Sequence, residues 1–365
     1  MKKIIGVFIL VIGLAFWQCS KMDTKPDLKQ SIRNGVENIN TAISKISQSK
    51  GYQFLSTVDQ AGKALAVSTG TGSSLLSGDV ESKSMEWETL ADSIDLALVA
   101  GIYDYQPSPF RPHHFYFPVS LFKKTGESEH MIVNLPQKLA FGPKYLHNYC
   151  TCDTTLKNNF TIDASDYHLY FRGWNIFDYK LSAGFRLDGE DIGSSEITSV
   201  SDMDHGASYM SKFNFTDGYH ITKEFTRGDT TTSAFSLNKD NDTLLKETSK
   251  FIWLGFRNVE RQYILTIGDV QIRKSSGVDS IQVFLDGVLQ KKAAVKVIDE
   301  GDGEHSICHS RDLLLTFDDG TTDNLSELIA PAREALKSLW SSLGDMYFAK
   351  HIVDYIAISI FFNTH

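Results

Sequence analysis

Residues 210–237, MSKFNFTDGYHITKEFTRGDTTTSAFSL, show the pattern that sets the fold of this chain. Segments 210–215, 220–225 and 233–237 within this stretch alternate apolar and polar side chains, and Gly, Asp and Thr separate them. A period of two residues is typical of strands with one buried face. The connections are too short for the crossover helices that parallel strands require, so the segments are predicted to pair antiparallel, as a meander.

Strand-like segments continue on both sides of this stretch, from about residue 130 to residue 317. They include residues 130–133, 167–171, 179–187, 251–256 and 263–270. A hairpin is predicted between 281–285 and the residues from Val288 onward, because Asp286-Gly287 supplies the positive φ that a two-residue turn needs. The chain has no internal repeat at a fixed period, which argues against a solenoid or a propeller.

Helical patterns flank the strands. Residues 28–46 carry an apolar stripe at helical spacing, with Asp27 as N-cap and Gly51 as the stop. A second helix is predicted over 87–98, stopping at Gly101, and a third over 324–343. The apolar run 352–362 is expected to be a buried closing strand, with a helix as the alternative.

The predicted fold class is α+β, with a large, mainly antiparallel, curved β-sheet (a meander or half-barrel) covered by two or three helices. We expect a helical N-terminal part over 27–102, with a Gly- and Ser-rich loop at 68–84. The β-rich part is expected over 103–365 and includes the C-terminal helix 324–343. Its first segment, 103–118, contains prolines and should be extended.

The N-terminus has the pattern of an export signal. Lys2 and Lys3 precede an uncharged, apolar run over 4–17, which as a helix would rise only about 21 Å, too short to span a membrane. Cys19 follows this run directly and begins the polar stretch Cys-Ser-Lys.

This arrangement resembles the signal of exported bacterial lipoproteins of the Bacteroidetes type, although Gln18 stands where that signal usually has Gly, Ala or Ser. The resemblance implies a signal peptide over 1–18, a diacylglycerol on Cys19, and a polar tether over 19–26. It also implies an exported protein at the outer membrane, facing the periplasm or the cell surface. The alternative is an uncleaved anchor with an incidental cysteine.

Composition limits the partners. The chain is 42% apolar and 22% charged, which is ordinary for a globular protein with a substantial core. The formal net charge of −9, without a long run of Lys or Arg, excludes the basic footprint of a nucleic-acid-binding protein. The same charge gives little attraction to anionic lipid heads, so the expected membrane link rests on the lipid alone.

The remaining cysteines, Cys150, Cys152 and Cys308, allow one disulfide at most, between Cys308 and one of the other two. They also lie in two short clusters of possible zinc ligands. These clusters contain His147, Cys150 and Cys152, and His305, Cys308 and His309. A zinc site, a disulfide and unreactive thiols therefore all stay open, and no cofactor is expected.

One motif indicates an enzyme. Residues 313–320, LLLTFDDG, resemble the first motif of polysaccharide deacetylases, which implies a base and a metal ligand at Asp318 and Asp319. That family also uses a histidine pair at H-x-x-x-H spacing downstream, and here only His351 and His365 follow. The alternative is a strand that ends in an Asp-Asp-Gly turn.

Aromatic and histidine-rich segments give weaker indications. Tyr167, Tyr170, Trp174 and Trp253 could form a stacking platform for sugar rings, although aromatic residues on strands are more often core residues. The pair at 113–114, His-His, could line a pocket or belong to a surface loop.

Two classes of function follow from the sequence. The first is a non-enzymatic, lipid-anchored envelope protein that binds an apolar ligand, a glycan or a partner protein. The second is an envelope hydrolase acting on polysaccharide. If the helices do not cover the sheet completely, an apolar cavity is expected beside them.

Lipidation of Cys19 is directly testable. Expressed in a suitable bacterial host, the protein should incorporate labelled fatty acid and partition into detergent, and Cys19→Ser should abolish both. Labelling that continues in the serine variant would contradict the lipoprotein interpretation.

Overall fold

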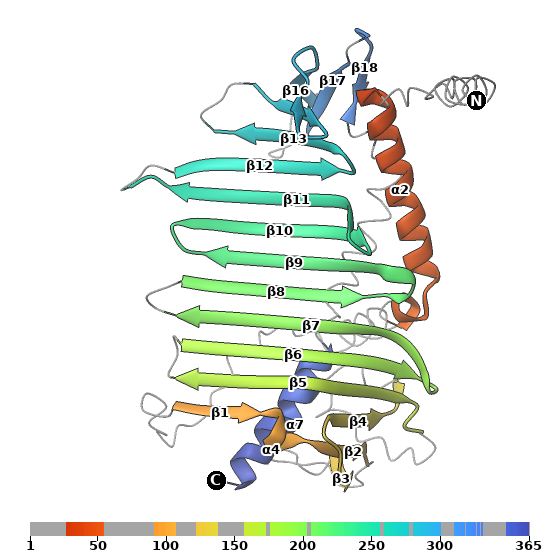
Figure 1. The fold of residues 1–365 in the computed structure, drawn as a ribbon, viewed down its shortest axis with the longest axis vertical. Coiled ribbons are helices and arrows are strands. Elements are labelled where there is room, and N and C mark those ends of the chain that lie inside the picture. Colours follow the sequence, from red (N-terminus) through yellow and green to blue (C-terminus); the bar gives the residue numbers. More distant parts are fainter. Residues whose placement is uncertain are drawn as a thin grey trace, which may run out of the picture.

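A computed structural model describes residues 27–54, 91–106, 122–137, 157–172, 176–202, 206–255, 259–276, 280–300, 310–317, 319–325, 327–328, 330 and 348–364. Most of these residues belong to one large sheet, with helices α2 and α7 beside it (Figure 1). Helix α2 is Leu28–Gln48 and helix α7 is Phe348–Thr364. The predicted signal peptide, Cys19, the tether and the loop 68–84 lie outside the described residues.

The large sheet contains a continuous antiparallel meander, in which each strand pairs with the next one along the chain. Its strands are β4 Met131–Leu135, β5 Phe160–Arg172, β6 Ile176–Leu187, β7 Glu190–Asp202, β8 Gly206–Asn214, β9 Tyr219–Arg227, β10 Thr230–Lys239, β11 Asp242–Trp253, β12 Val259–Ile267, β13 Val270–Ser275, β14 Gln282–Leu285 and β15 Val288–Leu289. The sheet does not close on itself, because β15 and β3 (Phe122–Gly126) are its ends. The predicted large, mainly antiparallel sheet is confirmed.

The first strands depart from a simple meander. β2 (Gly101–Tyr105) pairs antiparallel with β3 but parallel with β4, so the sheet is mixed. β1 (Ala91–Asp95) adds to β5 outside the main path.

The prediction of a helix over 87–98 is therefore wrong for the part of this segment that the structure describes. Residues 91–95 form β1, and only α4, Leu96–Val99, is helical. Pairing with β5 satisfies the backbone of this short segment and buries Ile94, which outweighs a weak helical pattern. Gly101 does not cap a helix; it begins β2, where its φ of 145° brings it against Lys124 and Gly126.

Helix α2 is confirmed, including its cap, since the Asp27 carboxylate accepts a hydrogen bond from the Gln30 backbone N–H at 2.8 Å. The predicted stop at Gly51 is wrong. The helix ends at Ser49, whose hydroxyl donates to the Ile46 carbonyl and accepts from the Tyr52 N–H, and residues 50–54 form a further helical turn.

The apolar stripe of α2 packs on one face of the sheet, which we call the inner face. Five buried residues on consecutive strands β8 to β12 form a row across this face in direct register: Phe213, Ile221, Leu237, Leu245 and Ile267. A Cβ added at Gly35 of α2 would lie 2.7 Å from Ile267 Cγ2, so helix and row are in close contact. The row lies near one end of each strand, and α2 covers that end.

Helix α7 covers the inner face of β5 and β6. Its Phe348 ring lies 5.7 Å from Phe160 and 5.2 Å from Phe185. Phe54, which follows α2, stacks on Phe160 at 4.4 Å and contacts Phe348 at 5.3 Å, so both helices join one core.

The closing strand predicted over 352–362 is wrong, and the alternative, a helix, is correct. An apolar run alone does not distinguish a strand from a buried helix. Here Ile352, Val353, Ile356 and Ala357 are all buried at helical spacing. Among the described residues, no helix is both long and apolar enough to cross a membrane.

A second, three-stranded sheet lies beyond the end of the large sheet that β13, β14 and β15 form (Figure 1). It consists of β16 Ala294–Glu300, β17 Ser310–Thr316 and β18 Thr322–Asn324. Lys29 of α2 contacts it through Asp323 at 3.5 Å and Thr321 at 3.0 Å. Of the helix predicted over 324–343, residues 325, 327, 328 and 330 are helical, Asn324 ends β18, and the remainder lies outside the described residues.

The docking of the helical turn after α2 can be tested at Gly51. A Cβ at this position would lie 2.3 Å from the Ile192 backbone carbonyl, which cannot move aside easily. We expect Gly51→Ala to lower the free energy of unfolding by about 1–3 kcal/mol, measured by urea denaturation. Gly184→Ala is the control, since a Cβ there meets nothing within 4 Å, and equal losses in both variants would contradict this packing.

Candidate ligand-binding site

The inner face is hollowed where α2 does not cover it. A hollow of about 420 Å³ opens on strands β8 to β11. It is lined by Tyr209, Lys223, Glu224, Phe225, Ser233, Ala234, Phe235, Glu247 and Ser249. Binding sites for small molecules in proteins have volumes of roughly 300–1,000 Å³, so this space has the size of a ligand site.

Strand register explains how distant residues meet in the hollow. Phe235 on β10 lies directly opposite Lys223 on β9 and Glu247 on β11. One step along the strands, Ser233 lies opposite Phe225 and Ser249. Side chains two residues apart share a face, so these residues continue the inner face on which the buried row lies.

The hollow lies where the side chains of the inner face change, along each strand, from apolar residues to a mixture of polar and aromatic residues. Under α2 the side chains are Ile, Leu and Phe; farther along they are Ser233, Ser249, Lys223 and Glu247, with aromatic rings between them. Phe235 is 5% exposed and forms the floor, whereas Ser233 is exposed. The result is an aromatic floor with polar groups of both charge signs.

A tyrosine on the neighbouring strand holds the carboxylate of Glu247 in place. The Tyr263 hydroxyl donates to Glu247 Oε1 at 3.1 Å, from the neighbouring strand β12. Burial and then the Glu247 carboxylate raise the pKa of Tyr263 above its ordinary value, so this tyrosine stays protonated as a donor. Glu247 is thereby held beside the hollow by this hydrogen bond.

A smaller, more apolar pocket of about 240 Å³ lies between α7 and the β2–β3 end of the sheet. Its lining includes Leu98, Phe122, Tyr355, Ile356 and Ile360. Tyr103, also in the lining, donates to the Val99 carbonyl at 2.8 Å, and burial followed by Glu127 raises the pKa of Tyr103 to about 12. Lys124 and Ser359 complete its lining, so the pocket has a cation and hydroxyl groups but no carboxylate beside its apolar walls.

The most buried polar cluster anchors α7. Tyr167 and Tyr179 both donate to Asp354 Oδ1, at 3.2 and 3.0 Å, and Lys350 contacts the other carboxylate oxygen. Lys350 Nζ also lies 4.3 Å from the centroid of the Tyr179 ring. Burial and then the Asp354 charge raise the pKa of both tyrosines. Because each donor faces an acceptor, the cluster is a docking contact between helix and sheet.

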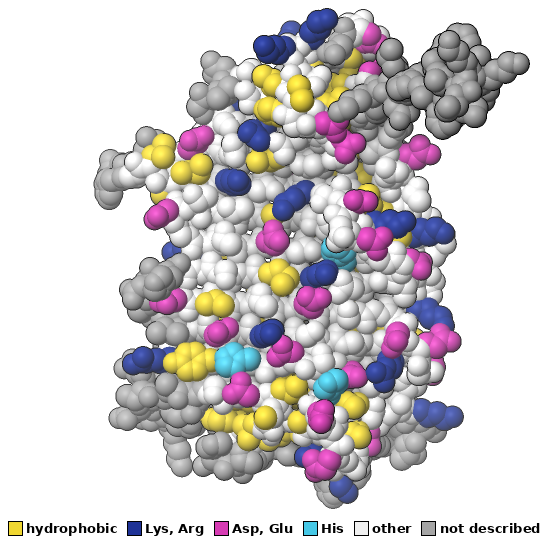
Figure 2. All heavy atoms as spheres, viewed as in Figure 1, with side chains coloured by type: hydrophobic (Ala, Val, Ile, Leu, Met, Phe, Trp, Pro, Cys, Tyr) yellow, Lys and Arg dark blue, Asp and Glu magenta, His cyan; other side chains and the backbone are white. Residues whose placement is uncertain are grey.

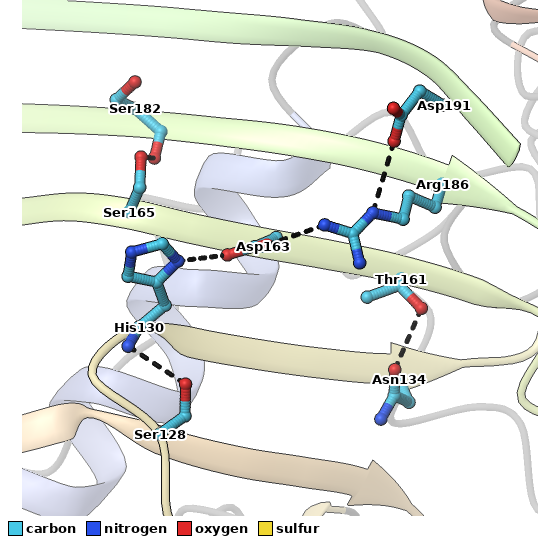
Figure 3. A network of polar contacts seen from close by, with 9 residues as sticks. All are labelled: Ser128, His130, Asn134, Thr161, Asp163, Ser165, Ser182, Arg186 and Asp191. Atoms are coloured by element: carbon cyan, nitrogen blue, oxygen red, sulfur yellow. Dashed lines mark hydrogen bonds and ion pairs between the residues drawn. The ribbon is translucent and has the colours of Figure 1, made fainter. Parts of the chain in front are cut away.

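The opposite, outer face is polar, with scattered charges and few apolar side chains (Figure 2). One network on it runs across β4 to β7 (Figure 3): His130 Nδ1 lies 2.8 Å from Asp163, Arg186 donates to Asp163 at 3.1 Å, and Arg186 also reaches Asp191 at 3.2 Å. The residues lie far apart in the sequence, and strand register brings them together, so the sequence patterns did not reveal them.

This network contains a histidine and a carboxylate, as hydrolases do, but lacks an aligned nucleophile in the part of the chain that the structure describes. The Ser165 hydroxyl donates to the Ser182 carbonyl at 3.5 Å (Figure 3). The hydroxyl of Ser128 accepts from the His130 backbone N–H at 3.1 Å rather than from its ring. A triad would require a hydroxyl on the free ring nitrogen.

The position that the sequence favoured for the aromatic residues, in the core, is found for Tyr167 but not for Trp253, and these two do not form a sugar platform together. Tyr167 is 2% exposed in the core on β5, whereas Trp253 is 57% exposed at the end of β11. At about 4.8 Å between neighbouring strands, the six steps from β5 to β11 separate them by roughly 29 Å. Trp174 and the histidine pair 113–114 lie outside the described residues.

The metal candidates His147, Cys150, Cys152, His305, Cys308 and His309 also lie outside the described residues, and the disulfide and zinc alternatives stay predictions. Within the described ranges, no group of three or more His, Cys, Asp or Glu side chains could hold a metal ion.

Of the deacetylase-like pair, Asp318 lies outside the described residues, and Asp319 serves a turn. The Asp319 carboxylate accepts from the Thr321 N–H at 2.9 Å and from its hydroxyl at 2.6 Å. These hydrogen bonds lower the pKa of Asp319. Gly320, with a φ of 79°, completes the turn between β17 and β18.

Comparisons of the chain with protein-family models, with curated proteins and with solved structures found no match. The chemistry of the hollow therefore has to follow from its own residues.

The turn interpretation of the Asp-Asp-Gly motif predicts that Asp318→Asn leaves metal content unchanged and costs about 1 kcal/mol or less of unfolding free energy. Metal analysis of purified protein and urea denaturation measure the two quantities. Asp319→Ala, which removes the turn acceptor, is the matched variant and should also leave metal content unchanged. Stoichiometric zinc that is lost on either substitution would favour the deacetylase.

Proposed function

We propose that this chain is a non-enzymatic, lipid-anchored protein of a bacterial cell envelope, and that it binds an amphipathic ligand in the hollow of its inner face. The observation that supports this most is the lining of the hollow. Three aromatic rings from adjacent strands, Tyr209, Phe225 and Phe235, lie among Lys223 and Glu247. Aromatic rings beside a cation, carboxylates and hydroxyls suit a ligand with an apolar body and a polar head.

The fold supports the same proposal. Helices α2 and α7 pack on one face of the sheet, and we propose that the sheet curves around this face as an open half-barrel. The hollow then lies inside the curve, beside α2. A lipid-anchored carrier or receptor needs such a site facing away from bulk water, because apolar ligand surface is stabilised by about 25 cal/mol for each Å² removed from water.

The proposed location follows from the export signal. With lipid on Cys19, the described part of the chain would stand at the outer membrane, facing the periplasm or the cell surface, within reach of envelope lipids. A glycan or a partner protein as ligand, and the polysaccharide hydrolase, are the alternatives that the sequence left open. The hydrolase alternative gains no support from Asp319, because the Asp319 carboxylate accepts hydrogen bonds within a turn.

The test is titration of the chain that follows Cys19 with a fluorescent fatty acid, cis-parinaric acid. Phe225→Asp places a carboxylate among the aromatic rings and should weaken binding about tenfold or more, which corresponds to about 1.4 kcal/mol. Val200→Asp is the control, because Val200 is 43% exposed on β7, outside the hollow. Equal affinities of the native chain and both variants, or no binding at all, would contradict the proposed site.

A further inference from the structure

Large apolar side chains are concentrated at one exposed point of the molecule. Of those exposed among the described residues, four belong to a single hairpin, β11–β12: Phe251 (37%), Trp253 (57%), Leu254 (59%) and Tyr263 (39%). The sequence here, FIWLGFRN over 251–258, contains only one charged residue. Singly scattered apolar residues are normal on surfaces, but a cluster on one projection marks a contact site.

Contacts within the hairpin hold these side chains in place. We call the four residues Phe251, Trp253, Leu254 and Tyr263 the β11–β12 tip. Phe251, Trp253 and Tyr263 share one face by strand alternation, and the Trp253 N–H donates to the Asp229 carbonyl at 3.2 Å. The Arg261 guanidinium lies 5.8 Å from the centroid of the Phe251 ring. In Figure 1, the end of β11 and the residues directly after it reach beyond the ends of the neighbouring strands.

The area of the tip decides between partners. Aromatic side chains have about 150–250 Å² of surface each, and with a similar area for Leu254 the four residues present roughly 290–480 Å² at these exposures. A stable protein–protein interface needs about 800 Å² on each partner. The tip is therefore too small for a stable protein partner by itself, whereas on a lipid surface its binding would scale with the apolar area it buries and would add to a lipid anchor.

The residue types specify a lipid interface. Trp and Tyr concentrate at the boundary between hydrocarbon and headgroups, where an apolar ring and a polar atom are both accommodated. Arg261 can extend its charge to the headgroups while its stem lies along Phe251. Residues 251–263 contain Arg257, Glu260 and Arg261, a net charge of +1, and the whole chain carries −9, so a zwitterionic lipid is the first lipid to test.

We propose that the β11–β12 tip, in which Trp253 and Leu254 are the most exposed of the described residues, inserts into the headgroup region of a lipid bilayer. The contact would orient the sheet on the membrane, whereas a lipid on Cys19 alone would leave the sheet free to rotate on its tether. This inference rests on the proposed function for the presence of a membrane and is independent of the ligand in the hollow.

The experiment attaches the whole chain that follows Cys19 to phosphatidylcholine vesicles through an N-terminal histidine tag and a nickel-chelating lipid. Attachment then does not depend on lipidation of Cys19. Tryptophan fluorescence is measured in vesicles with and without brominated acyl chains. Because the chain holds other tryptophans, Trp253→Phe isolates the signal of Trp253 by difference.

We expect brominated lipid to quench Trp253 and its emission to shift to shorter wavelength, and Leu254→Ser to reduce both effects. Val288→Ser, at a residue that is 64% exposed on a different hairpin, should change neither. Phe225→Asp, which disrupts the proposed ligand site in the hollow, should also change neither quantity. A failure of the ligand-binding proposal can therefore be distinguished from a failure of the membrane-contact proposal. Emission of Trp253 that brominated lipid does not alter, or quenching that persists in full in Trp253→Phe, would overturn the proposal.

Discussion

The packing of helix α2 on the inner face is the interaction on which the rest of the structure depends. Six large apolar side chains of its stripe, from Leu28 to Ile46, are buried in the same core as the row of Phe213, Ile221, Leu237, Leu245 and Ile267. At about 1.5–3 kcal/mol for each buried large side chain, the gross stabilisation is on the order of 10 kcal/mol. An antiparallel sheet of this width can leave one face in water but must cover the other. Because α2 covers only one end of the strands, the same contact that stabilises the sheet also leaves the hollow beside it.

The ends of so wide a sheet would expose unpaired backbone groups to other chains. Both ends are short: β15 has two residues and β3 has five. β3 also carries Lys123 and Lys124 on the edge, and charged side chains oppose pairing with another strand. Docking of α7 through Asp354, Tyr167 and Tyr179 closes the β5–β6 end of the core. The apolar surface left uncovered includes the rings of the hollow, the pocket beside α7 and the β11–β12 tip, and the hollow and the tip are the two places proposed to contact lipid.

Local patterns predicted much of this fold, and long-range pairing accounts for what they missed. The α2 stripe and the alternating strands follow directly from the sequence, as does the Asp286-Gly287 turn, where both residues have positive φ. β1 was predicted as a helix because its partner strand β5 lies more than sixty residues away. The sequence predicted that a cavity would lie beside the helices, but it did not predict which residues line it. The lining depends on a register shift at Leu237 and Asn238 and on the position of α2.

The central claim is that the uncovered end of the inner face holds an amphipathic molecule in the cell. Native mass spectrometry of the protein, extracted from the envelope with a mild detergent, measures this most directly. The account predicts one bound molecule of lipid-like mass on the native protein and its loss from Phe225→Asp, with Val200→Asp unaffected. Native protein that is recovered free of any bound molecule, or a molecule that Phe225→Asp retains in full, would contradict the account.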